Sequence, residues 1–210
     1  MNQKNSFGLN ECFLNIDNPI ELFKIWMEKA KKHEISDPNA LSLATSDKDG
    51  NPSVRMILLK NVSEKGFIFY TNLNSKKSLD INKNPKAAMC FYWKSLRRQI
   101  IIIGSINPVE DAIADEYFNS RDYESKIGSW ASNQSEILDN RNDLLKKIKE
   151  YKKKYPNTND LPRPKHWSGW NLNPSSIEFW LYGPSRIHER LKYNKVNNKW
   201  KNICQVKRKY

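Results

Sequence analysis

The sequence predicts an α+β protein built around an antiparallel β-sheet or barrel with flanking helices. Three observations favour this fold class. Short segments of alternating polar and apolar residues follow one another closely between residues 40 and 109, with short turns between them. Helical periodicity is confined to the segments around this block and to one short stretch inside it. The G-x-G-x-x-G fingerprint of doubly wound dinucleotide-binding folds is missing from the sequence.

The first predicted element is an amphipathic helix over residues 19–32. Asn18 is a suitable N-cap, and Pro19 suits the first helical position. Apolar side chains then recur at helical spacing. We expect residues 1–18 to form a flexible N-terminal segment and residues 19–210 to fold as a single domain.

The strands and the remaining helices follow in an order that favours antiparallel pairing. Expected strands cover residues 40–45, 53–62, 67–71, 87–93 and 98–109, with a short helix at 75–83. Two helices at 109–120 and 136–155 come next, and strands at 176–181, 187–193 and 200–206 end the chain, with Asn197 and Asn198 at the last turn. Neither block of strands closes comfortably alone, which favours one α+β domain that contains both.

The composition is that of a globular protein, with 38% hydrophobic and 11% aromatic residues. No apolar run approaches the roughly 18 residues that a membrane-spanning helix needs, and the N-terminus lacks the apolar core of a signal peptide. Cys12, Cys90 and Cys204 form no C-x-x-C pair. With three scattered histidines, we expect no metal site, no disulfide and a cytoplasmic location.

The formal net charge of +13 leaves three interpretations open. Clustered lysine and arginine can bind nucleic acid, or they can bind a small anionic ligand in a cationic pocket. A general lysine bias of the sequence explains the charge equally well, because much of the excess lies in residues 146–155 and 205–210.

Two lysines at a predicted helix start form the first candidate anion site. Asn74 or Ser75 is the expected N-cap, which places Lys76 and Lys77 in the first helical turn. Cations there oppose the helix dipole, and a bound anion would reverse this effect. The alternative is that both are ordinary surface lysines.

Two further sets of residues are candidates for the same chemistry. Arg55 and Lys60 lie five residues apart in an apolar strand, so both serve one ligand only near its ends or across a bulge; otherwise they are exposed charges on an edge strand. Tyr117, Arg121 and Ser125 recur every four residues, and a continuing helix would line them up as a cradle for a dianion. A capped, exposed helix end is the alternative.

The segment around residue 188 is the most informative. Arg186, His188 and Arg190 alternate with other residues, so an extended chain displays all three on one face. Two cations beside an imidazole are unfavourable unless an anionic or electron-rich ligand lies opposite. This pattern favours a ligand site over a polar outer strand face.

Together these segments resemble the pyridoxamine/pyridoxine 5'-phosphate oxidase family. The blocks occur in the family's order and cover most of the chain: RMILLK (55–60), FYTN (69–72), SKKS (75–78), FYW and RRQI within 91–100, residues 117–135, HWSGW (166–170), IEFW (177–180) and RIHER (186–190). The resemblance implies an FMN-binding split β-barrel that works as a homodimer, with FMN at the subunit interface.

The resemblance also implies a role for individual residues. FMN is expected to contact Arg55, Met56, Ile57, Leu58, Lys60, Tyr70, Thr71, Lys76, Lys77, Gln99, Gln134, Ser135, Trp180 and Arg190. The substrate phosphate is expected to contact Lys60, Tyr117, Arg121 and Ser125. Arg186 and His188 are the expected catalytic residues, which bind the pyridine ring and orient the reacting carbon.

The implied reaction is oxidation of pyridoxamine or pyridoxine 5'-phosphate to pyridoxal 5'-phosphate, with dioxygen reduced to hydrogen peroxide. The family usually has arginine at the position of Lys76, so we expect weaker FMN binding here. One alternative is a split-barrel flavoprotein with another substrate, but the Tyr117 and Arg186 sets argue against it. Another is a basic nucleic-acid-binding protein, although the sequence contains no recognised module of that kind.

Overall fold

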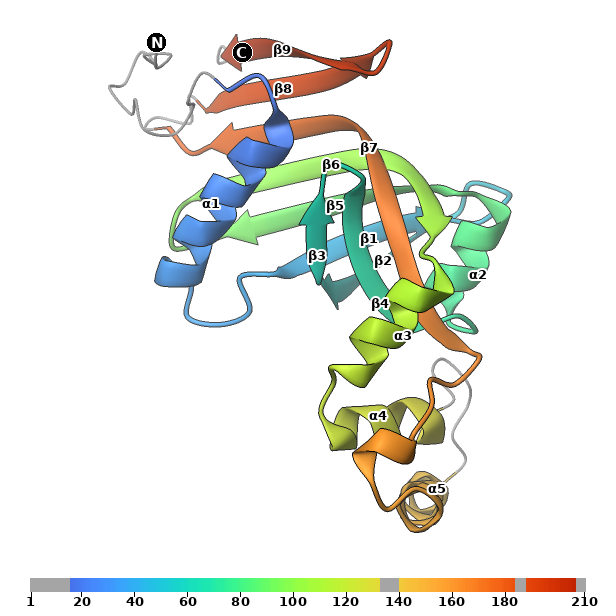
Figure 1. Cartoon of the computed structure of the whole chain (residues 1–210). Helices are drawn as coiled ribbons and strands as arrows, with labels where there is room; N and C mark the ends of the chain where they lie inside the picture. Colours follow the sequence, from blue (N-terminus) through green and yellow to red (C-terminus); the bar gives the residue numbers. More distant parts are fainter. Residues whose placement is uncertain (1–15, 133–139, 184–187, 207–210) are drawn as a thin grey trace.

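The computed structural model describes residues 16–132, 140–183 and 188–206, and shows a curled antiparallel sheet with helices packed around it (Figure 1). Within these residues nine strands form one sheet in the order β2-β1-β5-β6-β7-β4-β3, and β8 and β9 continue from β7. The strands are β1 Ala40–Ser46, β2 Pro52–Leu58, β3 Asn61–Ser63, β4 Gly66–Asn72, β5 Lys86–Trp93, β6 Arg98–Pro108, β7 Trp167–Leu181, β8 Glu189–Val196 and β9 Lys199–Val206. The predicted antiparallel α+β architecture is therefore confirmed.

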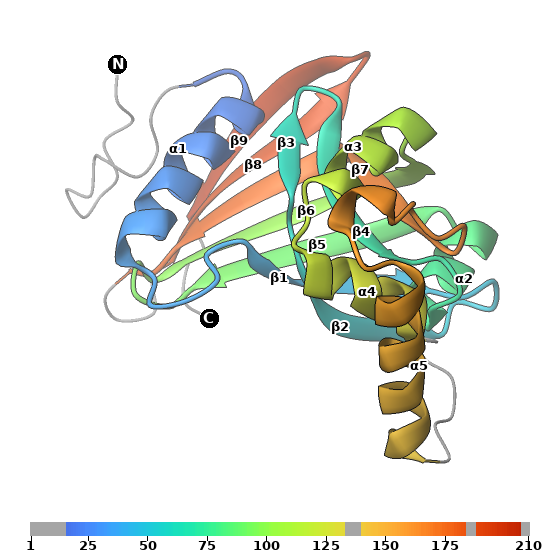
Figure 2. The ribbon, with the colours of Figure 1, turned by 60° about the horizontal axis from the view of Figure 1, so that its bottom comes forward.

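The helices lie in two groups around this sheet. They are α1 Pro19–His33, α2 Lys76–Lys83, α3 Asp111–Asn119, α4 Tyr123–Ala131 and α5 Arg141–Lys154. Helix α1 covers the inner face of the sheet, whereas α3, α4 and α5 extend away from it near the start of β7 (Figures 1 and 2). In the part of the chain that the structure describes, no helix combines the length and apolar character needed to cross a bilayer.

Helix α1 closes the hydrophobic core. The predicted cap is confirmed, because the Asn18 side chain accepts a hydrogen bond from the backbone N–H of Ile20 at 3.0 Å. Phe23 packs edge to face on Phe67, with ring centroids 5.0 Å apart, and Trp26 packs in the same way on Phe179 at 5.2 Å. Burial of each such ring contributes roughly 1.5–3 kcal/mol.

Strand β7 branches the sheet. Its first half pairs with β4, its second half pairs with β8, and β6 runs along both halves. The pairing with β6 shifts register between Ile103 and Gly104. A Cβ atom at Gly104 would lie 2.0 Å from the Asn173 carbonyl oxygen, so only glycine permits this close approach. The bulge lets the two halves of β7 follow different curvature.

One strand expected in the first half of the chain was wrong. The strand expected over residues 53–62 is two strands, β2 and β3, because Leu59 turns inward and its N–H donates to the Asn39 carbonyl at 2.9 Å. The backbone N–H of Lys60 then donates to the Ile68 carbonyl at 2.9 Å, and this bond starts the pairing with β4. Because β2 ends at Leu58, Arg55 and Lys60 do not belong to one regular strand, and the alternation that would place them on opposite faces does not apply.

The helical region also differs from the prediction. Helix α3 ends at Asn119, and the unpredicted helix α4 follows before α5. Asp122 caps this new helix by accepting a hydrogen bond from the Ser125 N–H at 2.8 Å. Tyr117, Arg121 and Ser125 therefore do not share one continuous helix.

The terminal strands were predicted in order but not in length. Strand β7 starts at Trp167 rather than Ser176, because residues 167–170 are buried on both faces and show no alternation. The last turn is confirmed: Asn197 and Asn198 have φ values of 50° and 60°, as a tight hairpin between β8 and β9 requires. Residues 1–15 of the expected N-terminal segment lie outside the described residues.

Candidate active site

A cavity of about 930 Å³ lies between β2, β4, the start of α2, the α3–α4 junction and the start of β7. Its volume lies within the range of roughly 300–1,000 Å³ that is usual for ligand pockets. It is lined by a large part of the site predicted from the sequence: Arg55, Met56, Ile57, Leu58, Lys60, Tyr70, Thr71, Lys76, Lys77, Tyr117, Arg121 and Ser125. The cavity therefore collects all three candidate anion sites that precede residue 130.

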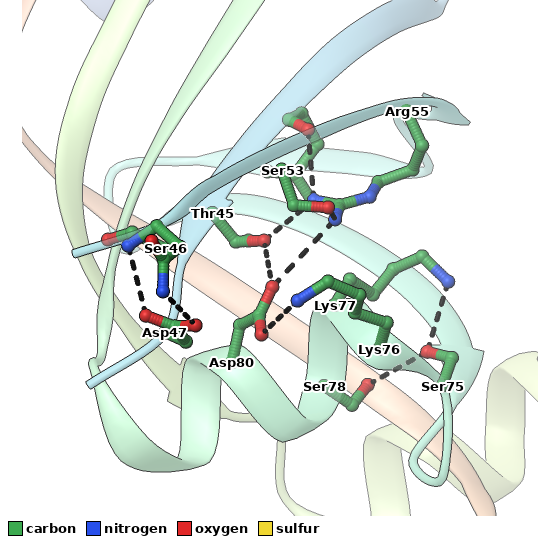
Figure 3. A network of polar contacts seen from close by, with 12 residues as sticks. Thr45, Ser46, Asp47, Ser53, Arg55, Ser75, Lys76, Lys77, Ser78 and Asp80 are labelled. Atoms are coloured by element: carbon green, nitrogen blue, oxygen red, sulfur yellow. Dashed lines mark hydrogen bonds and ion pairs between the residues drawn. The ribbon is translucent and has the colours of Figure 1, made fainter. Parts of the chain in front are cut away.

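Arg55 projects from β2 into the cationic part of this cavity (Figure 3). Its guanidinium donates to the Thr45 hydroxyl at 2.7 Å, to the Ser53 hydroxyl at 2.5 Å and to the Leu43 carbonyl at 3.1 Å. Burial lowers the pKa of Arg55, and the nearby Asp80 carboxylate opposes this effect. These contacts fix the guanidinium at one position on the cavity wall.

Asp80 lies beneath this cationic group and was not assigned from the sequence. Its side chain on α2 is only 5% exposed. It accepts hydrogen bonds from the Thr45 hydroxyl at 2.8 Å and from the Lys76 ammonium at 3.1 Å, and it lies 3.9 Å from the Arg55 guanidinium (Figure 3). The (i, i+4) spacing to Lys76 was available in the sequence, but the contact with β1 and β2 depends on the fold.

Lys77 points into the cavity from the first turn of α2. Its ammonium donates to the Thr71 hydroxyl at 3.1 Å and to the Ser75 hydroxyl at 3.0 Å. Burial, together with the positive charge of Arg55, lowers the pKa of Lys77 to about 8. An anion beside this ammonium would favour its charged form.

The N-terminus of α2 is also arranged for an anion. Ser75 is the N-cap, as one of the two alternatives predicted, but its hydroxyl donates to the Asn72 carbonyl at 2.7 Å and makes no side-chain cap. The first backbone N–H groups of the helix consequently keep their capacity to bind a ligand.

Arg121 belongs to the second group of polar side chains around the cavity, beside Tyr117 and Ser125. It follows the end of α3 and donates to the Ser129 hydroxyl of α4 at 2.6 Å. Its guanidinium also lies 4.8 Å from the centroid of the Trp167 ring. Burial lowers the pKa of Arg121, and the guanidinium remains charged at any physiological pH.

Three aromatic rings form the wall next to Arg121. Tyr70 stacks on Tyr117 with ring centroids 4.0 Å apart, and Trp167 stacks on Tyr70 at 5.4 Å. Burial is the main cause that raises the pKa of Tyr70. Trp167 lines the cavity but was named in the sequence only as part of the HWSGW block, because a tryptophan in a buried strand is usually a core residue.

The other predicted residues that the structure describes lie elsewhere on the chain. Gln99, Trp180 and Arg190 face one another across β6, β7 and β8, and the Arg190 guanidinium pairs with Glu178. The His188 ring lies 4.7 Å from the Trp180 ring, and its Nδ1 accepts from the Gly183 N–H at 3.2 Å. None of these four lines the cavity of its own chain. Gln134, Ser135 and Arg186 lie outside the described residues.

The cross-strand row formed by Gln99, Trp180 and Arg190 continues into an exposed apolar face of the sheet. Tyr92 pairs with Gln99 in the same row and is 58% exposed. Val54 and Met56 on the edge strand β2 are 69% and 64% exposed, and both also line the cavity. An apolar face of this kind on a sheet usually marks an interface.

A curled antiparallel sheet with a cationic cavity of this kind defines the class of FMN-binding split-barrel proteins. A solved pyridoxamine 5'-phosphate oxidase-related, FMN-binding protein from Nostoc punctiforme shares the fold, with a TM-score of 0.71 and 13% identity over 91% of this chain and 98% of that one. PhzG from Burkholderia lata 383, solved with tetrahydrophenazine-1-carboxylic acid, matches with a TM-score of 0.85 and 31% identity over 92% of this chain and 94% of its own.

The chain belongs to the pyridoxamine 5'-phosphate oxidase family. The family model described as pyridoxamine 5'-phosphate oxidase matches residues 27–155, and that of the pyridoxine 5'-phosphate oxidase C-terminal dimerisation region matches residues 167–203. A pyridoxine/pyridoxamine 5'-phosphate oxidase of Pelagibacter ubique is 63% identical over 93% of this chain and 94% of the relative. The enzyme of that name from Caulobacter vibrioides is 47% identical over 89% of this chain and 84% of the relative.

Proposed function

We propose that this protein oxidises pyridoxamine 5'-phosphate and pyridoxine 5'-phosphate to pyridoxal 5'-phosphate, with FMN as cofactor and dioxygen as the acceptor that becomes hydrogen peroxide. The observation that carries the proposal is a single cavity lined by two sets of anion-binding side chains from different elements. A phosphorylated flavin and a phosphorylated substrate that react together require two phosphate sites in one cavity. The names of the relatives agree with this chemistry.

The first set fits the phosphate of FMN. Arg55, Lys76 and Lys77 surround the uncapped start of α2, and Asp80 offsets one of their three charges. The two positive charges that remain balance the two negative charges of a phosphate dianion. The adjoining wall, with Met56, Ile57 and Leu58 of β2 and Tyr70 and Thr71 of β4, is apolar enough to receive the flavin ring. When bound, FMN supplies the electron chemistry, accepting a hydride from the substrate and passing electrons to dioxygen.

The second set fits the substrate phosphate. Lys60, Tyr117, Arg121 and Ser125 combine an ammonium, a guanidinium and two hydroxyls on one cavity wall. Hydrogen bonds between charged groups of this kind contribute about 1.5–3 kcal/mol each. We infer that these side chains hold the substrate at its phosphate and leave its reacting carbon free to face the flavin site.

The predicted site residues that do not line the cavity of their own chain reach the cavity of a second copy in the dimer. The chain carries the family's dimerisation region, and its exposed apolar face suits a second copy. Val54 and Met56 belong both to this face and to the cavity wall, so a copy that covers the face also covers the cavity. We infer that Gln99, Trp180 and Arg190 of one chain complete the FMN site of the other, with His188 against the substrate ring.

We also assign the protein to the cytoplasm. Cys90 is a free thiol in the described part of the chain, and burial raises its pKa, which keeps it protonated and unreactive. Three widely spaced cysteines without a C-x-x-C pair are typical of a protein from a reducing compartment.

The proposed function is tested by supplying the FMN-loaded protein with pyridoxamine 5'-phosphate under air. We expect pyridoxal 5'-phosphate and hydrogen peroxide to form in equal amounts. Pyridoxamine without its phosphate is the matched control, and we expect its turnover to be far slower at equal concentration. A protein that binds FMN but oxidises neither pyridoxamine 5'-phosphate nor pyridoxine 5'-phosphate would contradict the proposal.

A further inference from the structure

Two of the contacts that hold the Arg121 guanidinium in place, the shortest ones, come from residues outside the predicted site; the Phe118 ring lies farther away, at 5.8 Å. The Ser129 hydroxyl accepts one of its N–H groups at 2.6 Å, and the Trp167 ring lies beneath it at 4.8 Å. The charge of the Asp122 carboxylate acts on Arg121, but among the described ion pairs none joins the two side chains. The position of the Arg121 guanidinium therefore depends on an uncharged hydroxyl and an aromatic face.

Ser129 is oriented for this contact by its own helix. Its hydroxyl donates to the Ser125 carbonyl one turn earlier, at 3.0 Å. Because the single hydroxyl proton is used there, the oxygen lone pairs remain available to accept from Arg121. The Ser129 carbonyl contacts His166 Nε2 at 2.9 Å, which ties this end of α4 to the segment before β7.

Trp167 is fixed just as firmly. Its side chain is 7% exposed, and its ring packs edge to face on Phe118 at 5.2 Å. The Arg163 guanidinium donates to the Trp167 carbonyl at 2.9 Å and pairs with Asp111 and Asp115 of α3. Arg163 thus joins the start of β7 to the first half of α3, and the Phe118 contact joins the Trp167 ring to the end of α3.

A guanidinium that binds phosphate needs this kind of support. Arginine recognises phosphate through a planar fork, so its orientation decides how many hydrogen bonds it can make. A free arginine side chain loses up to roughly 2 kcal/mol of rotamer entropy when it is fixed. A side chain that is already held in place loses less on binding.

We propose that Ser129 and Trp167 are positioning residues that hold Arg121 in the orientation required by the substrate phosphate. Ser129 fixes one edge of the guanidinium, and Trp167 fixes its plane. The remaining N–H groups of Arg121 are then presented to the cavity. The inference rests on the proposed function, because it takes the ligand of Arg121 to be a phosphorylated pyridine.

Ser129→Ala removes one hydroxyl and tests the proposal with little risk to folding. We expect the KM for pyridoxamine 5'-phosphate and the dissociation constant of pyridoxal 5'-phosphate, measured by fluorescence titration, to rise about tenfold. The kcat and the affinity for FMN should stay near those of the unaltered protein. Ser129→Thr keeps the hydroxyl and should restore most of the binding.

A matched control removes a comparable hydroxyl far from Arg121. Ser63 accepts a hydrogen bond from the Lys65 N–H at 3.2 Å in the β3–β4 turn, outside the cavity. Ser63→Ala should leave both binding constants unchanged. Equal KM values for Ser129→Ala and Ser63→Ala would overturn the role of Ser129.

A double-mutant cycle tests whether Ser129 acts through Arg121. In the Arg121→Ala background, Ser129→Ala should cause no further loss of pyridoxal 5'-phosphate affinity, because the group that it positions is gone. A second loss as large as in the unaltered protein would show that Ser129 acts in another way and would overturn the proposal. The same cycle with Trp167→Leu in place of Ser129→Ala tests the aromatic contact. Trp93→Phe, which removes a buried indole elsewhere in the protein, is its control.

The outcomes separate this inference from the proposed function. If the unaltered protein does not oxidise pyridoxamine 5'-phosphate, the proposed function fails. If it does, and Ser129→Ala and Trp167→Leu both keep the original KM and pyridoxal 5'-phosphate affinity, the positioning role alone fails.

Discussion

At the scale of single residues, the cationic group at the start of α2 depends on a buried carboxylate. Asp80 lies within hydrogen-bonding distance of Lys76 and close to Arg55, while Lys77 lies beside the same helix terminus. Without Asp80, cations in the first turn of α2 would repel one another and oppose the helix dipole. The carboxylate therefore stabilises this group of cations as well as fixing its position.

Asp80→Asn should destabilise the protein without FMN by about 1–3 kcal/mol, because Arg55 and Lys76 lose their anionic partner. Urea unfolding of the protein without cofactor measures this change. Asp143→Asn is a suitable control, since Asp143 forms an exposed pair with Lys146 on α5 at 3.6 Å. An Asp80→Asn variant no less stable than this control would contradict the assigned role.

We predict that Lys77 makes FMN binding depend on pH. Its pKa of about 8 lies below the ordinary value of 10.5 because of burial and Arg55, so the ammonium loses its proton as the pH rises through 8. In the proposed site the FMN phosphate binds the protonated form, and so affinity should be highest below pH 8 and fall above it. Calorimetry near pH 8.5 in buffers of different ionisation enthalpy should also show proton uptake on binding.

Lys77→Arg separates this effect from other titrations. Arginine keeps its charge throughout this range, so the variant should bind FMN without the fall above pH 8 and without proton uptake. A pH profile that is the same in both proteins would exclude Lys77 as the titrating group.

At the scale of elements, interruptions of regular structure bring the site residues together. Arg55 and Lys60 were expected on opposite faces of one strand, and the break at Leu59 places both in one cavity. Alternation within 53–62 predicted a strand, but the hydrogen bond from Leu59 to Asn39 involves residues distant in sequence. A local pattern cannot reveal such a contact.

The break between α3 and α4 illustrates the same limit. The spacing of Tyr117, Arg121 and Ser125 grouped three residues that line one cavity, although the chain forms the alternative of a helix that ends before Arg121. Asp122 starts the new helix through its hydrogen bond to Ser125, and this contact lowers the pKa of Asp122. An aspartate three residues before a serine is too common a pattern to predict a cap alone.

Asp122→Ala should loosen the start of α4 and with it the position of Ser125. We expect the KM for pyridoxamine 5'-phosphate to rise about two- to fivefold, with a modest fall in Tm. Asn140→Ala removes the corresponding cap of α5, where the side chain accepts from the Asn142 N–H at 2.9 Å. That control should lower Tm similarly and leave KM unchanged; a rise in KM for both variants would contradict a local effect at the cavity.

At the scale of the whole molecule, the sheet order and the cavity follow from pairings between distant segments. Sequence patterning predicted the order of strands and the charged and hydroxyl side chains of the cavity, because it identifies strands and polar positions; Met56, Ile57, Leu58, Tyr70 and Thr71 came from the resemblance. It did not predict that β7 would branch between β4 and β8, which separates Gln99, Trp180 and Arg190 from the cavity of the same chain. Only the resemblance grouped these residues with FMN.

Dimerisation should control cofactor binding. Val54→Asp introduces a charge into the exposed apolar face of β2, and we expect monomers with greatly reduced FMN affinity. Analytical ultracentrifugation and flavin fluorescence measure the two effects. Ile35 is 99% exposed, and Ile35→Asp should change neither. A Val54→Asp variant that is monomeric yet binds FMN with full affinity would show that the second copy does not complete the site.

The most direct test of the proposed function is reduction of bound FMN by pyridoxamine 5'-phosphate in the absence of oxygen. Mixed in equal amounts, the holoenzyme and substrate should lose the yellow flavin absorbance as pyridoxal 5'-phosphate forms. Readmitted air should restore the colour and release one hydrogen peroxide per flavin. Flavin that remains oxidised with saturating pyridoxamine or pyridoxine 5'-phosphate would contradict the assignment of this cavity.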